Sequence, residues 1–465
     1  MEAESTICAI ATAQGGALGI IRVSGIDAIN ITDKIFAPKD NIPLKNRNPY
    51  TLAYGKIYDK TEVIDEVLVS IFHAPHSYTG ENSTEISFHN STYIANRILN
   101  LLIESGCRQA TPGEYTLRAF MNGKMDLSQA EAVADLIAST NKATHKMAIN
   151  QLRGKFSVEL QSLRQQLIHI TSLIELGLDF SDHEELEFAN YDELLSLAEK
   201  IEERISYLLK SFKTGQAIKR GIPVAIIGKT NVGKSTLLNQ LLEDDKAIVS
   251  NIHGTTRDVI EDTMDINGVT FRFIDTAGIR KTTDEIESLG IERTFKKIEE
   301  ASIIIWVTDN TPSDNDIIDI KPKMGGKRTI IALNKTDTIK DVEQQIATLK
   351  EKTELFSINN SSIIDISAKQ GTNISELKSI IYDAANIPEI KENDVIVTSI
   401  RHYNALFSAH QNMTNLINGI KQNIGSDLLS EDLRQCIHCL NEIIGDAIRT
   451  EDTLESIFSN FCIGK

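Results

Sequence analysis

The sequence has few cysteines, no long apolar run and a shortage of positive charge. Its 465 residues include only five cysteines, an odd and scattered set that fits reduced thiols better than a disulfide framework. No apolar run approaches the roughly 20 residues that a membrane-spanning helix needs. The first residues, Met1-Glu-Ala-Glu-Ser5, are acidic where a secretory signal would be basic. We therefore expect a cytoplasmic protein with no membrane partner.

Positive charge is also scarce. Lysine and arginine number 48 against 65 aspartates and glutamates, a net charge of −17. A protein that binds nucleic acid alone normally presents a basic face, because phosphate contacts supply most of the affinity. The acidity leaves room for a local basic patch, but it indicates that a nucleic-acid substrate would be held partly by another protein.

The first part of the chain has the pattern of a small α+β domain. Short β-like runs at 18–23, 67–72 and 83–88 alternate with turn clusters, and one helical stretch lies near 92–105. From about residue 126 the pattern changes. Leucine and isoleucine recur at steps of three and four over 160–174 and 194–208, which predicts long amphipathic helices.

Strand and helix patterns then alternate from Ile222 to about Ala385, as in a doubly wound parallel sheet, and helical periodicity returns after Pro388. Helices on both sides predict that the α/β block is inserted into a helical domain; four consecutive domains are the alternative. The expected bounds are 1–118 for the α+β domain, 119–218 and 386–465 for the helical halves, and 219–385 for the inserted block.

Cys436-Ile-His-Cys439 has the spacing of half a zinc site. No second pair accompanies it. We therefore interpret the two cysteines as buried positions of a helix.

Five motifs typical of guanine-nucleotide-binding proteins follow in order between Gly228 and Lys369. A buried-type strand leads into the first motif and a helix follows it, which is the context of a phosphate-binding loop. Glycines in such a loop let backbone N–H groups point at phosphates. The motifs are Gly228-Lys-Thr-Asn-Val-Gly-Lys-Ser235, Gly254-Thr-Thr-Arg-Asp258, Asp275-Thr-Ala-Gly278, Asn334-Lys-Thr-Asp337 and Ser367-Ala-Lys369.

These motifs predict GTP and Mg²⁺ as ligands. Lys234 is placed to reach the β- and γ-phosphates, and Ser235 and Thr256 to hold the metal. Asn334 and Asp337 would select guanine, whose N1–H and 2-amino group a carboxylate accepts. The candidate nucleotide-binding residues are Asn231, Val232, Gly233, Lys234, Ser235, Thr236, Ser250, Asn251, Ile252, His253, Gly254, Thr255, Thr256, Asp275, Thr276, Ala277, Gly278, Asn334, Lys335, Asp337, Ser367, Ala368 and Lys369.

The motif set leaves the water-orienting residue open. Ile279 follows Asp275-Thr-Ala-Gly278, where Ras-like enzymes place a glutamine that orients water. Asp284, Glu285 and Glu287 are downstream candidates, or simply a solvated face. Asn231 could reach a monovalent cation beside the phosphates, or it could only form a turn.

Together these motifs resemble the tRNA-modification GTPase family called MnmE or TrmE, essentially from end to end. The resemblance extends to Gly19-Ile-Ile-Arg-Val-Ser-Gly25, Ser77-Tyr-Thr-Gly-Glu81, Ala110-Thr-Pro-Gly-Glu-Tyr-Thr116, the stretch from Arg118 to Glu131, and the terminal Ile457-Phe-Ser-Asn-Phe-Cys-Ile-Gly-Lys465. It implies a multidomain fold: an α+β N-terminal folate-binding-like domain that dimerises, an α-helical central domain, and an inserted α/β P-loop, Ras-like G domain.

The resemblance also implies site residues. The family contacts 5-formyl- or methylene-tetrahydrofolate at the positions of Arg22, Glu85, Lys124 and Lys465. Its water-orienting glutamate falls on Glu287. Its potassium site falls on Asn231, Ser250, Ile252 and Thr255.

The resemblance also concerns a cysteine near the end of the chain and one stretch that departs from the family. Cys462 matches the family's near-terminal cysteine, with nucleophilic and positional roles both open. The chain departs from the family at Ser87-Phe-His89-Asn-Ser91, where a Gly-rich turn is usual.

The implied activity is potassium-activated GTP hydrolysis, which drives addition of a carboxymethylaminomethyl group at C5 of the wobble uridine (U34) of certain tRNAs. The implied assembly is a homodimer that joins the FAD-containing MnmG (GidA) protein in a heterotetramer and acts on tRNA. One alternative is a regulatory or ribosome-assembly GTPase that binds RNA without modifying it. Another is a folate-binding scaffold with a vestigial G domain.

Overall fold

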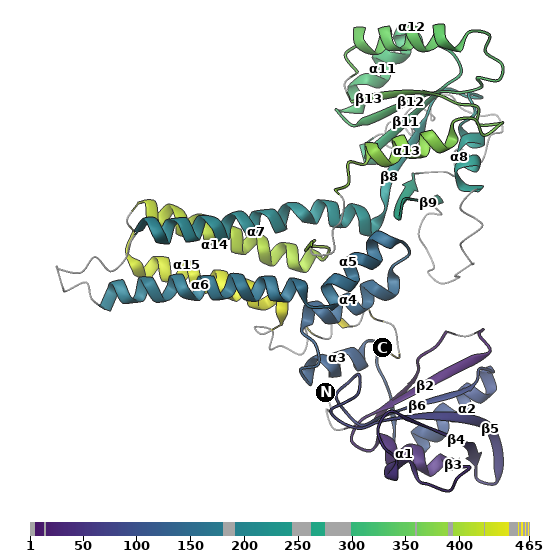
Figure 1. The fold of residues 1–465 in the computed structure, drawn as a ribbon, viewed down its shortest axis with the longest axis vertical. Helices are drawn as coiled ribbons and strands as arrows, with labels where there is room; N and C mark the ends of the chain where they lie inside the picture. Colours follow the sequence, from purple (N-terminus) through teal and green to yellow (C-terminus); the bar gives the residue numbers. More distant parts are fainter. Residues whose placement is uncertain are drawn as a thin grey trace. The chain divides into compact units, whose positions relative to one another are not determined.

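The computed structural model describes residues 5–13, 15–179, 191–243, 262–274, 299–358, 360–388, 394–422 and 424–445, with residues 454, 457, 458, 461 and 464. The chain forms two compact units, drawn with their element labels in Figure 1. Unit 1 consists of Met1–Ala138, Ala148–Ile205 and Asn404–Lys465, and unit 2 of Ser139–Met147 and Ser206–Tyr403.

Unit 1 begins with a seven-stranded sheet in the order β3-β4-β5-β6-β2-β1-β7, antiparallel except for the β1–β7 pair. Helices α1 and α2 pack on one face and share its apolar core. The elements are β1 (Ile7–Ile10), β2 (Leu18–Ser24), α1 (Ala28–Ile35), β3 (Phe36–Pro38), the 3₁₀ turn Leu44–Asn46, β4 (Thr51–Asp59), β5 (Glu62–Phe72), β6 (Ser83–His89), α2 (Thr92–Glu104) and β7 (Arg108–Gln109).

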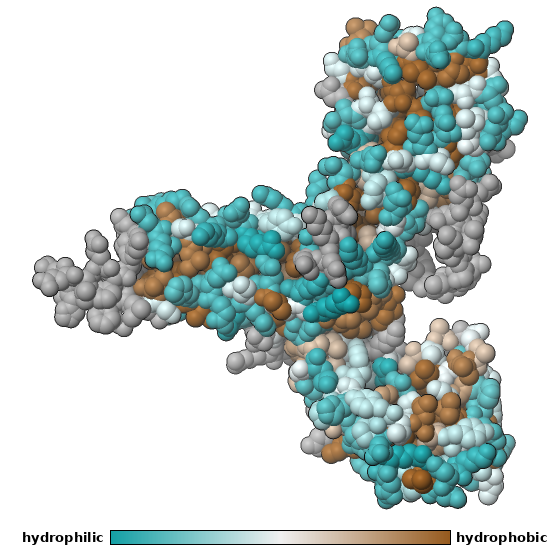
Figure 2. All heavy atoms as spheres, in the orientation of Figure 1, coloured by the Kyte–Doolittle hydropathy of each residue, from teal (hydrophilic) through white to brown (hydrophobic). Residues whose placement is uncertain are grey.

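The two faces of this sheet differ because successive side chains of a strand point to opposite sides. On β4 and β5, Ala53, Val67 and Val69 are buried against the helices, whereas Leu52 and Leu68 are exposed. In Figure 2 apolar residues are visible at the surface of this sheet. One face is therefore a core face, and the other carries exposed apolar side chains.

The rest of unit 1 is helical. Helix α6 packs along α15, and α7 is tied to α14 by an ion pair of 2.9 Å between Glu199 and Lys421. The helices are α3 (Glu114–Met121), α4 (Leu127–Ala138), α5 (Lys142–Leu152), α6 (Lys155–Asp179), α7 (Tyr191–Arg220), α14 (Ile400–Lys421) and α15 (Ser426–Ile444), with the first residues of α5 and α14 and the last part of α7 in unit 2.

Unit 2 contains a six-stranded sheet in the order β13-β12-β11-β8-β10-β9, parallel except for the edge strand β9. Helices α8 and α13 cover one face, and α11 and α12 the other. The elements are β8 (Ile222–Ile227), α8 (Lys234–Glu243), β9 (Asp262–Ile266), β10 (Val269–Phe273), β11 (Ile303–Thr308), α11 (Asp314–Met324), β12 (Arg328–Leu333), α12 (Val342–Leu355), β13 (Ser361–Asp365) and α13 (Ile374–Ala384).

Strand β11 is buried along its whole length, because helices cover both faces of a doubly wound sheet. The predicted strands at 18–23, 67–72 and 83–88 and the helix near 92–105 are confirmed. Cys436 and Cys439 lie in α15 with 0% and 7% exposure, which confirms their interpretation as buried helical positions. Among the described residues, none of the helices is long and apolar enough to cross a membrane.

Candidate functional site

The phosphate-binding loop lies between β8 and α8. Gly228 and Gly233 have φ of 144° and 99°, which L side chains rarely adopt. A Cβ on Gly228 would lie 2.2 Å from the carbonyl oxygen of Val307, and one on Gly233 would lie 2.2 Å from Nδ2 of Asn334. Both positions therefore require glycine, and the loop forms the kind of backbone cradle that phosphates occupy.

Lys234 and Ser235 are the first two residues of α8. The Nζ of Lys234 donates to the carbonyl oxygens of Gly228 and Lys229, at 2.8 and 2.6 Å, so the ammonium is held over the loop. A helix N-terminus adds partial positive charge at the same place. This arrangement suits a polyanionic ligand. Thr236, the next residue of α8, has an exposed side chain.

Asn334 ties three of the motifs together. Its side chain is only 2% exposed. Its Nδ2 donates to the Val232 carbonyl at 2.8 Å, and its Oδ1 accepts from the Ala368 N–H at 2.9 Å. The amide therefore fixes the phosphate loop relative to the Ser367-Ala-Lys369 loop.

Asp337 presents an exposed carboxylate beside this junction. The hydroxyl of Ser367 donates to its Oδ1 at 2.7 Å, which orients the group. Lys335 adopts a φ of 64° and pairs with Asp309 at 2.7 Å, while Lys369 is exposed. An oriented carboxylate next to Ala368 suits recognition of a base that carries adjacent N–H donors.

Asn231 lies in the loop with a φ of 63° and an exposed side chain. Asparagine is one of the few residues that adopt this left-handed conformation readily. The geometry satisfies the turn-forming interpretation and leaves the side chain accessible to a ligand.

Several predicted positions lie outside the described residues, in the motifs that follow α8 and β10 and at the end of the chain. They are Ser250, Asn251, Ile252, His253, Gly254, Thr255, Thr256, Asp275, Thr276, Ala277, Gly278, Glu287, Cys462 and Lys465.

The predicted folate residues of unit 1 form a second cluster. Arg22 on β2 lies directly across from Glu85 on β6 and pairs with it at 2.8 Å, with side-chain exposures of 21% and 26%. The guanidinium carbon lies 5.3 Å from the ring centre of Tyr78 and 5.6 Å from that of Tyr115. Both charges are therefore partly accessible, and the guanidinium of Arg22 lies within cation–π distance of two aromatic rings.

Lys124 and Gly464 lie against neighbouring strands and loops. The Nζ of Lys124 donates to the Pro75 carbonyl at 3.0 Å, and its stem lies 3.4 Å from the position of a Cβ on Gly80. A Cβ on Gly464 would lie 2.6 Å from the Ile10 carbonyl oxygen, so Gly464 is closely packed on β1. Gly464 thus lies against β1, the strand that pairs with the Arg22-bearing strand β2.

A buried ionic network lies in the same unit as the predicted folate residues. Sequence patterns alone did not predict it. The carboxylate of Glu114 is 2% exposed and accepts from Arg108 at 2.6 Å and Arg118 at 3.0 Å. Arg118 also pairs with Glu81 at 3.0 Å. Burial alone would raise the pKa of Glu114, but hydrogen bonds from Arg108, Thr111 and Arg118 outweigh it and hold the pKa at about 2. The sequence alone does not distinguish these charged residues from ordinary surface residues.

The departure at Ser87-Phe-His89-Asn-Ser91 has a structural explanation. His89 Nδ1 lies 2.8 Å from Asp65 Oδ1, and Asn90 Nδ2 donates to the Ala13 carbonyl at 3.1 Å. Ser91 caps α2 by accepting from the Ile94 N–H at 3.2 Å. These side chains hold the end of β6 and the start of α2, a role that a Gly-rich turn would leave to the backbone.

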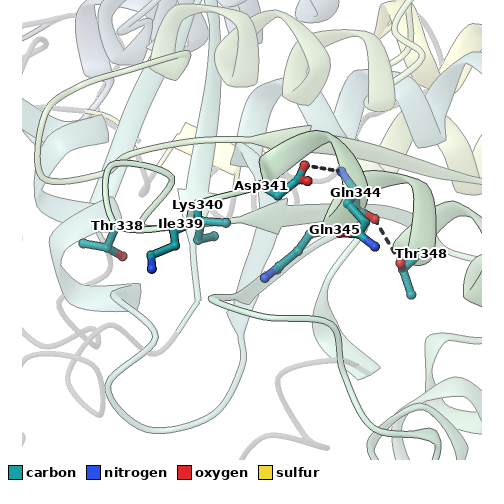
Figure 3. Close-up of a pocket in the computed structure, with 7 residues that line it drawn as sticks. All are labelled: Thr338, Ile339, Lys340, Asp341, Gln344, Gln345 and Thr348. Atoms are coloured by element: carbon teal, nitrogen blue, oxygen red, sulfur yellow. Dashed lines mark hydrogen bonds between the residues drawn. The ribbon is translucent and has the colours of Figure 1, made fainter.

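A hollow of about 600 Å³ lies at the start of α12. Figure 3 draws its lining residues, which are Thr338, Ile339, Lys340, Asp341, Gln344, Gln345 and Thr348. The carboxylate of Asp341 caps this helix by accepting from the Gln344 N–H at 3.0 Å. None of the predicted nucleotide ligands lines the hollow. We therefore place the nucleotide site at the phosphate loop and Asn334, where the motifs converge.

A strand, a glycine-requiring loop and a helix, joined through Asn334 to a base-recognition loop on a doubly wound sheet, define a P-loop GTPase. Comparison with known proteins identifies the family. A model of the N-terminus of the GTP-binding protein TrmE matches residues 6–124, and a model of the MnmE helical domain matches residues 127–462. The chain belongs to the MnmE family of tRNA modification GTPases.

Curated relatives match along almost their whole length. The tRNA modification GTPase MnmE of Phocaeicola vulgatus is 55% identical over 99% of this chain and 99% of its own. That of Bacteroides thetaiotaomicron is 54% identical over 99% and 100%. A crystal structure of a Sulfolobus solfataricus GTP-binding protein in complex with GDP is 21% identical, covers 48% of this chain and 67% of its own, and has a TM-score of 0.27; this similarity carries no part of the assignment.

Family membership confirms the expected multidomain fold, with an N-terminal α+β domain, a helical domain and a P-loop G domain. It also makes the chain an enzyme, a GTPase coupled to tRNA modification.

Proposed function

We propose that the chain is a potassium-activated GTPase that works with a flavin-containing partner. Hydrolysis would drive addition of a carboxymethylaminomethyl group at C5 of the wobble uridine (U34) of certain tRNAs. The observation that carries the proposal is 55% identity over 99% of the chain to a tRNA modification GTPase, with the phosphate loop and Asn334 junction intact. We assign residues 1–118 to the folate-binding domain, 219–385 to the G domain, and 119–218 and 386–465 to the helical domain.

The nucleotide site would bind GTP with Mg²⁺ and K⁺. Ser235 and Thr256 would hold Mg²⁺, and Asn231, Ser250, Ile252 and Thr255 would hold K⁺. The glycine cradle and the position of Lys234 fit a bound phosphate chain. A cation at Asn231 would supply the positive charge that an arginine finger supplies elsewhere, an effect of about 10³–10⁵ in rate.

Water must then be oriented by a residue other than Ile279, since an aliphatic side chain has no hydrogen-bonding group. Glu287 would take this role, as a carboxylate that accepts from the attacking water. Catalysis would thus combine charge neutralisation beside Asn231 with water positioning by Glu287.

A direct assay tests the cation. GTP hydrolysis by the purified chain should be faster in KCl than in NaCl at equal ionic strength, and Glu287→Ala should abolish the difference by removing turnover. Equal rates in the two salts would remove the potassium assignment. Retention of turnover by Glu287→Ala would remove the water-orienting role.

Arg22, Glu85, Lys124 and Lys465 would hold a tetrahydrofolate derivative in unit 1. Arginine and lysine suit the glutamate carboxylates of a folate, and Glu85 suits the N–H donors of its pterin ring. The partly exposed Arg22–Glu85 pair, whose guanidinium lies beside two aromatic rings, supports this assignment. The folate would supply a one-carbon unit, and Cys462 would contribute either as a nucleophile or by positioning the uridine.

The exposed apolar side of the N-terminal sheet supports a homodimer. Leu52, Tyr54 and Leu68 are 62%, 44% and 43% exposed on neighbouring strands, with Tyr54 directly across from Leu68. A charged Leu68→Glu variant should therefore shift the chain toward a monomer in light scattering, whereas Glu66→Gln on the same strand should not. An unchanged dimer in Leu68→Glu would place the interface elsewhere.

The acidic chain supports a partner that supplies the basic tRNA surface, and we propose that it is the FAD-containing MnmG (GidA) protein, in a heterotetramer located in the cytoplasm. Nucleoside analysis of tRNA from cells lacking the chain tests the modification. Unchanged wobble uridines would favour a regulatory or ribosome-assembly GTPase instead.

A further inference from the structure

The β9–β10 hairpin of unit 2 lies between two of the nucleotide-binding motifs in the sequence. It consists of residues 262–273, which follow the motif at 254–258 and precede the motif at 275–278. The hairpin is thus the covalent link between the two proposed switch motifs. Its turn residues Asn267 and Gly268 both have positive φ, 53° and 81°, the requirement of a tight two-residue turn.

A segment more than a hundred residues earlier in the chain holds this turn. The Nδ2 of Asn141 donates to Oγ1 of Thr270 at 2.7 Å, and the Ala143 N–H donates to the Gly268 carbonyl at 3.0 Å. The Cβ of Lys142 lies 2.8 Å from the position of a Cβ on Gly268. Both segments belong to the same compact unit, and α5 and β9 lie close together in Figure 1.

The contact is partly buried and continuous with the core of unit 2. Asn141 is 8% exposed, and Ala143 packs against the apolar cluster that contains Phe271 and Phe273 of β10. Hydrogen bonds shielded from water resist solvent competition. The turn of the hairpin is therefore anchored to the segment that begins α5.

The Asn141 side chain uses its two polar atoms on different elements. Its Oδ1 accepts from the Thr144 N–H at 2.8 Å and caps α5, while its Nδ2 reaches Thr270. Serine at this position would keep the cap, since it is an equally good N-cap residue, but its shorter side chain has no second polar atom to reach Thr270. The two roles can thus be separated by one substitution.

We propose that Asn141 is a positioning residue for GTP hydrolysis, which acts by anchoring the hairpin between the two switch motifs. This inference rests on the proposed assignment of Thr256 and Glu287 to those switches. Apart from the two switch motifs themselves, the residues proposed to bind the nucleotide follow β8, β12 and β13, away from the hairpin in the sequence. Loss of the anchor therefore lowers kcat and leaves nucleotide affinity unchanged.

The test uses the full chain and compares Asn141→Ser, Thr270→Val and Thr270→Ser, with steady-state GTP hydrolysis and GDP binding measured for each. Thr270→Val removes the hydroxyl that pairs with Asn141, whereas Thr270→Ser keeps it. We expect kcat to fall about twofold to tenfold in Asn141→Ser and Thr270→Val, the range one hydrogen bond is worth. Thr270→Ser should keep the parent kcat, and the dissociation constant of GDP should stay constant throughout.

The double variant Asn141→Ser/Thr270→Val should be no slower than either single variant, because both remove the same bond. Parent-like kcat in both single variants, additive losses in the double variant, or an equal loss of GDP affinity would each overturn the inference. If Asn141→Ser does not fold, the comparison of Thr270→Val with Thr270→Ser is sufficient to test the inference.

Thr256→Ala separates this inference from the proposed switch assignment on which it depends. If Thr256→Ala abolishes hydrolysis while the hairpin variants remain normal, only the inference about Asn141 fails. If Thr256→Ala hydrolyses GTP like the parent, the switch assignment itself fails.

Discussion

Replacement of Asp337 by asparagine should change which purine the G domain binds. In the structure Ser367 Oγ donates to Asp337 Oδ1 at 2.7 Å, so the carboxylate has a defined orientation beside Ala368. A carboxylate accepts from both the N1–H and the 2-amino group of guanine. Asparagine keeps one acceptor and presents a donor in place of the other, which suits the 2-oxo group of xanthine.

The magnitude follows from one charge-assisted hydrogen bond. Such a bond is worth about 1.5–3 kcal/mol, and tenfold in affinity is about 1.4 kcal/mol. Asp337→Asn should therefore weaken GDP binding about 10- to 100-fold and strengthen binding of xanthosine diphosphate by a similar factor.

Asn334→Ala is the matched control, and titration calorimetry of both nucleotides is the assay. Asn334 holds the Val232 and Ala368 backbone groups in place. Its loss should weaken GDP and xanthosine diphosphate equally. Unchanged base preference in Asp337→Asn, or a change of preference in Asn334→Ala, would refute the role derived for this junction.

Two further predictions concern a buried carboxylate and a glycine. Because the folded pKa of Glu114 is about 2 against an ordinary 4.5, its ionised form contributes about 3 kcal/mol above pH 4.5, and this stability is lost as the pH falls toward 2. Glu114→Gln should lower the urea-unfolding free energy at pH 7 and flatten this acid dependence, and an unchanged acid dependence would contradict the assignment. Gly233→Ala should weaken GDP binding at least about tenfold because its Cβ meets Asn334, a collision worth more than 1.4 kcal/mol. The control Gly326→Ala, with a φ of 75° and no atom within 4 Å of its Cβ, should bind GDP like the parent.

Local patterns predicted the phosphate loop well, since a strand, a glycine-rich turn and a helix are encoded by neighbouring residues. The expected strand at 223–228 corresponds to β8, and Gly228 and Gly233 have the positive φ that the loop chemistry requires. The expected doubly wound sheet also formed, because buried apolar runs such as 303–308 leave few alternatives.

Long-range contacts could not be predicted in this way. The amide of Asn334 joins Val232 and Ala368, which lie 102 and 34 residues away. The pairing of Arg118 with Glu81 likewise depends on how α3 packs against the sheet. Nothing in the sequence near Asn141 indicates Thr270 as its partner. Such contacts follow from tertiary packing, which composition and periodicity do not specify.

We propose that GTP hydrolysis by this chain drives modification of the wobble uridine. The decisive experiment is mass-spectrometric nucleoside analysis of tRNA from cells that carry Glu287→Ala at normal protein levels. We expect loss of the carboxymethylaminomethyl group to the level found in cells lacking the chain. Fully modified tRNA in the Glu287→Ala cells would contradict it.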